Sequence, residues 1–245
     1  MDALGVDHVS WHAGAIPIIE DVTLSVAPGE LVALIGPNGA GKTSLFNVIS
    51  GLYRPSGGRV LLGGADVTRL APYRRARRGL GRTFQTSAVF ASLSVTENVA
   101  LAVQAARGGS MRPWRRRSDR DITAAAGEVL EQVSLAPAKK AGELSHGEKR
   151  KLEIALLLAS APKMLLLDEP MAGVSAEDVP ALAEVIRGLT ADNRGVLMVE
   201  HHMDVVLDLA DRVAVMHHGT LLACDSPAAV MADATVQEAY VGEAL

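Results

Sequence analysis

The sequence of 245 residues predicts an α/β fold whose central sheet is mainly parallel. Apolar runs typical of strands buried on both faces occur at 31–35, 164–168 and 195–200. Segments with a helical pattern follow these runs. Strands that alternate with helices form parallel sheets, and the ligands of such sheets lie at the carboxyl ends of the strands.

The remaining segments indicate two additions to this core. Residues 1–30 alternate in polarity and turn at Pro28-Gly29, which indicates a small antiparallel β layer before the strand at 31–35. Residues 86–160 contain mainly helical patterns, and a capping box opens one helix at Ser94. We therefore expect one domain over 1–245, with a core from 1–85 and 161–245 and an inserted α-helical subdomain at 86–160. Further expected elements are a strand at 59–62, a helix at 72–78, a strand at 80–85 ending at Gln85, helices at 94–106, 121–133, 149–160, 176–188 and 203–210, a strand at 212–216 and a hairpin at 217–223.

Composition excludes several classes of protein. Hydrophobic residues make up 49% of the chain, which argues against disorder, and the net charge of −4 argues against a general nucleic-acid binder. The single cysteine fits a reducing compartment, and no signal peptide or membrane span is recognisable. A membrane role would therefore require a partner. The arginine clusters at 74–78 and 112–120 are expected to be solvated faces, and contact with lipid headgroups or an acidic partner loop is the lesser alternative.

The strand at 31–35 leads into a G-x-x-x-x-G-K-T loop that begins at Gly36 and opens a helix. Glycines let successive backbone N–H groups turn toward an anion, and the helix N-terminus faces the same point. The Lys42 ammonium can reach the β- and γ-phosphates, and the Thr43 hydroxyl can hold Mg²⁺. The sequence therefore predicts a site for a nucleoside triphosphate. Its residues are Gly36, Pro37, Asn38, Gly39, Ala40, Gly41, Lys42, Thr43 and Ser44.

Polar residues at three other strand ends supply the rest of this site. Asp168 is expected to orient Mg²⁺, and Glu169 is expected to polarise the attacking water as general base. The Gln85 amide could contact the metal or the water, and His201 could donate to a γ-phosphate oxygen.

Two further features allow a structural and a functional interpretation. Ser145 and Glu148 form a capping box, but a capped helix N-terminus that contains Gly147 is also an anion site. The capping box explains the serine and not the glycine. Trp11 is either a core or edge-strand aromatic residue or a platform for the nucleotide base.

The motifs GPNGAGKTS, Gln85, LSHGE, LLLDEP and His201 resemble, in order and spacing, those of ABC-transporter nucleotide-binding subunits. Within that family the chain is most similar to the ATPases of branched-chain amino-acid and urea uptake systems. RTFQTSAVFASLSVTENV, LSHGEKRKLEIA and the ending EAYVGEAL carry this similarity.

The resemblance implies a P-loop NTPase (RecA-like) core that binds ATP and Mg²⁺. It also implies a head-to-tail pair with a second ATPase subunit, identical or different, in which LSHGE completes the partner's site through Ser145 and Gly147. Gln85 and residues 86–93 would receive a helix of transmembrane permease subunits, at the cytoplasmic face of the membrane. A solute-binding protein would be an indirect partner. His146 and Glu148 depart from the usual LSGGQ, Ala13 stands where a base-stacking aromatic is usual, and Ser175 replaces an aspartate.

The expected function is ATP hydrolysis that energises a membrane importer, for branched-chain amino acids or a similar small polar solute. The alternatives are an exporter ATPase of the lipid or lipopolysaccharide type, a soluble ATPase that acts on nucleic acid, and a non-hydrolysing module. The insertion at 107–120 is far too short for the coiled coils of the nucleic-acid class. A non-hydrolysing module would lack Lys42 or Glu169, and both are present.

Overall fold

The computed structural model of this chain describes residues 2–83, 89–107 and 119–241, and it divides into two compact units. The sheet unit takes the chain up to Arg82, Lys163–Pro170 and the chain from Leu189 onward. The helical unit takes Thr83–Pro162 and Met171–Gly188. The second of these segments lies outside the helical subdomain expected at 86–160.

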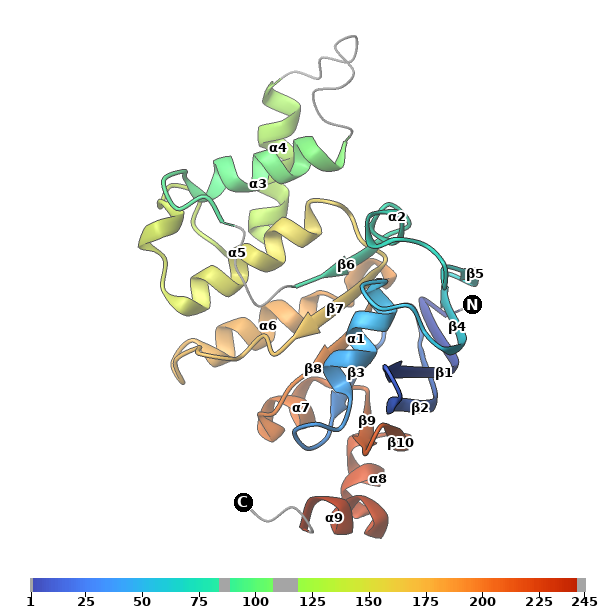
Figure 1. The fold of residues 1–245 in the computed structure, drawn as a ribbon. Helices are drawn as coiled ribbons and strands as arrows, with labels where there is room; N and C mark the ends of the chain where they lie inside the picture. The colour runs from blue at the N-terminus through green and yellow to red at the C-terminus, as the bar shows by residue number, and fades with distance from the viewer. Residues whose placement is uncertain (1, 84–88, 108–118, 242–245) are drawn as a thin grey trace. The chain divides into compact units, whose positions relative to one another are not determined.

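A six-stranded sheet forms the centre of the sheet unit (Figure 1). Its order is β10-β9-β3-β8-β7-β6, and all neighbours are parallel except β10, which is antiparallel to β9. Every residue of β3, β7 and β8 is buried, as their apolar sequences predict. The strands are β3 (Leu31–Ile35), β6 (Leu80–Arg82), β7 (Met164–Asp168), β8 (Gly195–Val199), β9 (Arg212–His217) and β10 (Thr220–Asp225).

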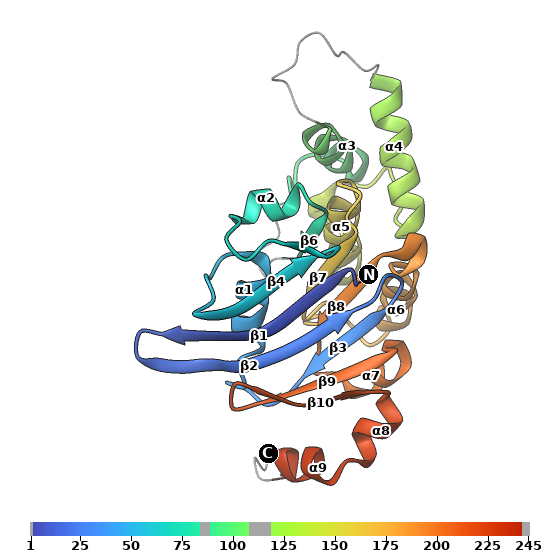
Figure 2. The same cartoon turned by 90° about the vertical axis from the view of Figure 1, so that its right-hand side faces the viewer.

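A four-stranded antiparallel sheet of order β2-β1-β4-β5 completes the unit (Figure 2). It contains β1 (Leu4–Ala13), β2 (Ile16–Val26), β4 (Gly57–Leu62) and β5 (Ala65–Asp66), so the expected antiparallel layer is present. One hydrophobic core joins both sheets to α1 (Lys42–Ser50), whose Leu45, Phe46 and Ile49 are fully buried. The other helices of this unit are α2 (Pro72–Ala76), α7 (Met203–Leu209), α8 (Pro227–Ala232) and α9 (Ala234–Val241).

Arg75 corrects one expectation, because it is buried while the other arginines of 74–78 are exposed. Its guanidinium donates to four main-chain carbonyls, those of Val48 (2.7 Å), Ile49 (2.6 Å), Thr68 (2.9 Å) and Leu70 (3.0 Å). The first two are carbonyls at the end of α1, which need partners and favour a cation. Burial lowers the pKa of Arg75 to about 10, so the group stays charged at neutral pH. Arg75 therefore fixes the segment 68–70 to the end of α1.

The helical unit is built from α3 (Val95–Ala106), α4 (Asp119–Gln132), α5 (His146–Leu158) and α6 (Val179–Gly188). The capping boxes expected at Ser94 and Ser145 are both confirmed. Helix α6 begins three residues later than the expected 176, after a turn in which the N–H groups of Asp178 and Val179 both bond to the Ser175 carbonyl. Within 2–83, 89–107 and 119–241, no helix has both the length and the apolar character needed to cross a bilayer.

Candidate functional site

The G-x-x-x-x-G-K-T segment forms a tight loop between buried β3 and α1. Gly36 has a φ of +146°, and a β-carbon there would lie 2.1 Å from the Met216 carbonyl oxygen of β9. Gly41 caps α1 with a φ of +101°, and a β-carbon there would lie 2.9 Å from the Ile18 carbonyl oxygen. Only glycine fits at these two points, because the loop packs directly on neighbouring backbone.

Lys42 opens α1 and is held over this loop. Its ammonium donates to the carbonyls of Gly36 and, at 2.8 Å, Pro37, and only 7% of the residue is exposed. Thr43 is exposed and Ser44 half-buried in the same turn, whose first N–H groups have no partner within the helix by position. The local sequence therefore places backbone donors, one ammonium and two hydroxyls at the N-terminus of α1.

Asp168 ends β7, as expected, with 8% of its surface exposed. Its Oδ2 lies 3.2 Å from Nη2 of Arg82, which ends β6. Nη1 of Arg82 also donates to the α1 residues Asn47 (2.8 Å) and Ser50 (2.8 Å). Arg82 thus connects the acidic strand end to the helix that carries Lys42. Arg82 was not predicted from the sequence as a site residue, although it lies near the end of a predicted strand.

Glu169 and His201, from the ends of different strands, are brought together. His201 Nε2 lies 3.0 Å from Glu169 Oε1, and the two side chains are 44% and 40% exposed. The Glu169 backbone N–H donates to the Val199 carbonyl at 2.9 Å, and Glu169 has a φ of +47°. The β7–β8 pairing extends to this bond, which brings the carboxylate to the same sheet edge as His201.

Glu200 also lines this site, although it was not predicted from the sequence. It is 2% exposed, and its Oε1 accepts the backbone N–H groups of His201 (3.1 Å) and His202 (3.3 Å). The same oxygen lies 2.6 Å from Nδ1 of His202. Glu200 therefore fixes the turn that presents His201. A cavity of about 300 Å³ lies here, lined by Ile35, Gly36, Pro37, Asn38, Glu200, His201 and Met203.

Ser145 and Gly147 lie in the helical unit, at the start of α5. The Ser145 hydroxyl accepts the Glu148 N–H at 3.1 Å, and Glu148 accepts the Ser145 N–H at 3.0 Å. Ser145 Oγ also lies 3.4 Å from a carboxylate oxygen of Asp178. Lys139 contacts Glu148 at 2.7 Å, and this bond, followed by that from Ser145, lowers the pKa of Glu148. The anion-binding role of this helix end stays a prediction.

Two other predicted residues complete the set. The Trp11 ring stacks on Tyr53, with centroids 4.4 Å apart and planes 9° from parallel, and it packs against the core. One face of Trp11 is therefore taken by Tyr53, and its role as a base platform stays a prediction. Gln85 lies outside the described residues.

The chain is similar to several known proteins. Residues 19–172 match the family model described as ABC transporter. The high-affinity branched-chain amino acid transport ATP-binding protein BraF of Pseudomonas aeruginosa is 35% identical over 98% of each chain. The lipopolysaccharide export system ATP-binding protein LptB of Haemophilus influenzae is 36% identical over 99% of this chain and 98% of its own.

A solved structure shows the same fold. The ADP conformation of an ATP-binding cassette of an ABC transporter superposes with a TM-score of 0.85 at 30% identity, covering 99% of this chain and 100% of the other. The resemblance and the fold class inferred from the sequence are both confirmed.

Proposed function

Because this chain belongs to the ABC transporter family, whose ATP-binding subunits hydrolyse ATP to drive transport, we propose that it energises an importer of branched-chain amino acids or a similar small polar solute. The full-length similarity to BraF supports the solute class. The observation that carries the catalytic part is the Glu169–His201 contact of 3.0 Å at the sheet edge that also carries the phosphate loop.

The residues of the sheet unit fit ATP and Mg²⁺. Backbone N–H groups of the loop and of the first turn of α1, with the Lys42 ammonium, would bind the phosphates. The Thr43 hydroxyl and the Asp168 carboxylate are hard oxygen donors of the kind Mg²⁺ prefers, and they would hold it with Gln85. When bound, Mg²⁺ neutralises charge that develops on the phosphate oxygens.

Glu169 and His201 divide the remaining work. The Glu169 carboxylate would accept a proton from the attacking water, and His201 Nε2 would exchange its contact with Glu169 Oε1 for an oxygen of the terminal phosphate. The Glu169–His201 contact holds both side chains at one sheet edge, and Glu200 fixes the backbone of His201 from behind. The proposed base and donor both belong to the sheet unit.

A second ATPase subunit, identical to this chain or different, would complete the site. Ser145 and Gly147 at the start of α5 would face the terminal phosphate bound by the partner subunit. The Ser145 hydroxyl would exchange its contact with Asp178 for the phosphate. ABC ATP-binding subunits work with transmembrane permease subunits, and we place this chain at the cytoplasmic face of the membrane through such a permease. A solute-binding protein would contact the permease from the other side.

Export is the second candidate function, because LptB is as similar as BraF over the same length. The direction of transport is tested by isolating the tagged chain from detergent-solubilised membranes and reconstituting it, with the permease that co-purifies, into liposomes. We expect labelled leucine to accumulate, in the presence of ATP, on the side of the membrane that carries the ATPase and not on the opposite side. The variant Lys42→Ala should abolish this accumulation. Co-purification with a lipid-extracting permease, and ATP hydrolysis that responds to lipopolysaccharide and not to solute, would overturn import.

A further inference from the structure

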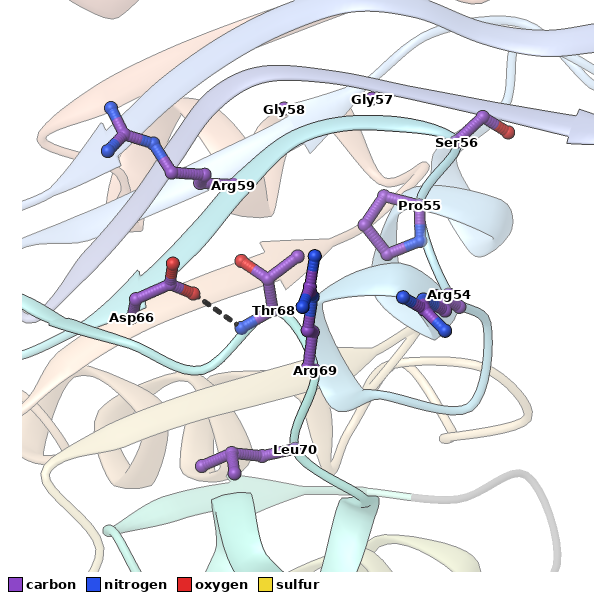
Figure 3. A pocket seen from close by; sticks show the side chains of 10 residues that line it. All are labelled: Arg54, Pro55, Ser56, Gly57, Gly58, Arg59, Asp66, Thr68, Arg69 and Leu70. Carbon is purple, nitrogen blue, oxygen red and sulfur yellow. Dashed lines mark hydrogen bonds between the residues drawn. The ribbon is translucent and has the colours of Figure 1, made fainter.

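A cavity of about 620 Å³ lies in the sheet unit between the segments 54–59 and 66–70 (Figure 3). It shares no lining residue with the cavity beside the phosphate loop. Its volume is within the usual range for small-molecule sites, about 300–1,000 Å³. Three arginines line it, Arg54, Arg59 and Arg69, with the hydroxyls of Ser56 and Thr68 and the apolar side chains of Pro55 and Leu70.

The charge of this arginine cavity is unbalanced. Arg59 is paired with Asp7, with Nη2 and Oδ2 2.7 Å apart, whereas Arg54 and Arg69 form no ion pair with any described residue. Asp66 is the single carboxylate among the lining residues. Its Oδ1 accepts the Thr68 N–H at 2.8 Å, and hydrogen bonds from Thr68 lower the pKa of Asp66, so it stays anionic. Two guanidinium groups without an ion pair, those of Arg54 and Arg69, thus share the cavity with one carboxylate among the described residues.

The wall that carries Arg69 is rigid. The buried Arg75 side chain donates to the main-chain carbonyls of Thr68 and Leu70, the two neighbours of Arg69 in the chain. The Val60 N–H donates to the Thr68 hydroxyl at 2.9 Å, and the hydroxyl's own hydrogen bond lowers the pKa of Asp66, so the Thr68 side chain is fixed in place. On the opposite wall, a β-carbon at Gly58 would lie 2.2 Å from the His8 carbonyl oxygen, so the glycine holds that strand against β1. The arginines therefore project from fixed backbone, which reduces the entropy lost on binding.

From this geometry we propose that the arginine cavity binds the phosphate group of a small organic phosphate of glycerophosphate type. A phosphate has more acceptor oxygens than a carboxylate and can use the forks of both Arg54 and Arg69. Pro55 and Leu70 provide apolar contact for the organic part. The ligand is either a soluble phosphate ester or the headgroup of an anionic phospholipid, and both present the same chemistry.

Two binding measurements separate these sources. Both use the full chain with Mg²⁺ and a non-hydrolysable ATP analogue present throughout, so that the phosphate loop is occupied. Isothermal titration with sn-glycerol 3-phosphate reports the soluble ligand. Sedimentation with phosphatidylglycerol vesicles, compared with phosphatidylcholine vesicles, reports the headgroup. Binding in either assay is expected, and the assay that responds identifies the source.

The variants decide whether the arginine cavity is responsible. Arg54→Ala/Arg69→Ala should weaken binding about tenfold or more, because two charge-assisted forks are lost. Arg74→Ala/Arg77→Ala removes the same charge from exposed positions of α2 and next to it, and should change binding less than about twofold. All four side chains are exposed, so both variants should fold, and circular dichroism checks this. Absence of binding in both assays, or equal losses in the two double variants, would overturn the proposal.

Discussion

Gly147 and Asp178 lie so close that a β-carbon at position 147 would be 2.8 Å from both the β-carbon and a carboxylate oxygen of Asp178. Both residues belong to the helical unit, where the start of α5 packs on the turn before α6. The glycine that the capping box leaves unexplained therefore has a packing reason, which is independent of any anion.

Gly147→Ala should destabilise the protein by about 1–3 kcal/mol, because the added methyl group overpacks a contact that includes the β-carbon of Asp178. Gly127→Ala in α4 is the matched control, since nothing lies within 4 Å of a β-carbon there. Alanine in a helix interior should stabilise by about 0.5–1 kcal/mol. Urea unfolding measures the free energy of unfolding of both variants. If both substitutions change it in the same direction, this packing explanation of Gly147 is wrong.

Ser145→Ala should lower ATP hydrolysis about 10²-fold or more, as expected for loss of a donor to the terminal phosphate, while ATP still binds. Ser94→Ala is the matched control, because Ser94 caps α3 through the same capping box. Both changes remove an N-cap, which costs about 1 kcal/mol of stability. Turnover assays of the two variants, at equal folded fraction, separate catalysis from capping. Equal rates would show that Ser145 acts only as a cap.

Glu169→Gln should reduce hydrolysis about 10²–10⁴-fold, because the amide cannot accept the proton of the attacking water. ATP binding should persist, and an ATP-bound pair of subunits should accumulate in size-exclusion chromatography. Glu184→Gln serves as the control, since Glu184 is an exposed carboxylate of α6 paired with Arg187. If the Glu169 variant hydrolyses ATP at the rate of the control, Glu169 is not the general base.

The Glu148 carboxylate should make stability depend on acid pH. Bonds from Lys139 and then Ser145 lower the pKa of Glu148 below its usual 4.5, so the stabilisation is present above that value and is lost as pH falls through the folded-state pKa. The stability difference between wild type and Glu148→Gln should therefore shrink as pH falls from neutral through 4.5 and on through the lowered folded-state pKa. Lys139→Met should reduce this pH dependence, because it removes the largest cause. A difference that stays constant across the range would refute the assignment.

Features encoded by neighbouring residues were predictable from the sequence. The phosphate loop, the buried strands and the capping boxes at Ser94 and Ser145 each depend on a few consecutive residues, and the strand–helix order followed from them. The prediction of a solvated face failed at Arg75, because its partners at 48–49 are distant in sequence and offer main-chain carbonyls that no side-chain pattern announces.

The same limit applies within the candidate site. Arg82 bonds to residues of α1 and to Asp168, and these partners come together only when β6 pairs with β7. Asp178 explains Gly147 only through the packing of α5 on α6. Side chains whose role depends on distant partners are those that sequence reasoning missed.

The division of the helical unit into two chain segments, Thr83–Pro162 and Met171–Gly188, limits how it can be exchanged by recombination. A single crossover fragment covering the first segment would carry Gly147 without its own Asp178. In the reverse exchange, a homologue's fragment would meet Asp178, and any β-carbon that it carries at position 147 would lie 2.8 Å from the Asp178 β-carbon. Functional hybrids of this protein should therefore require both segments from the same parent.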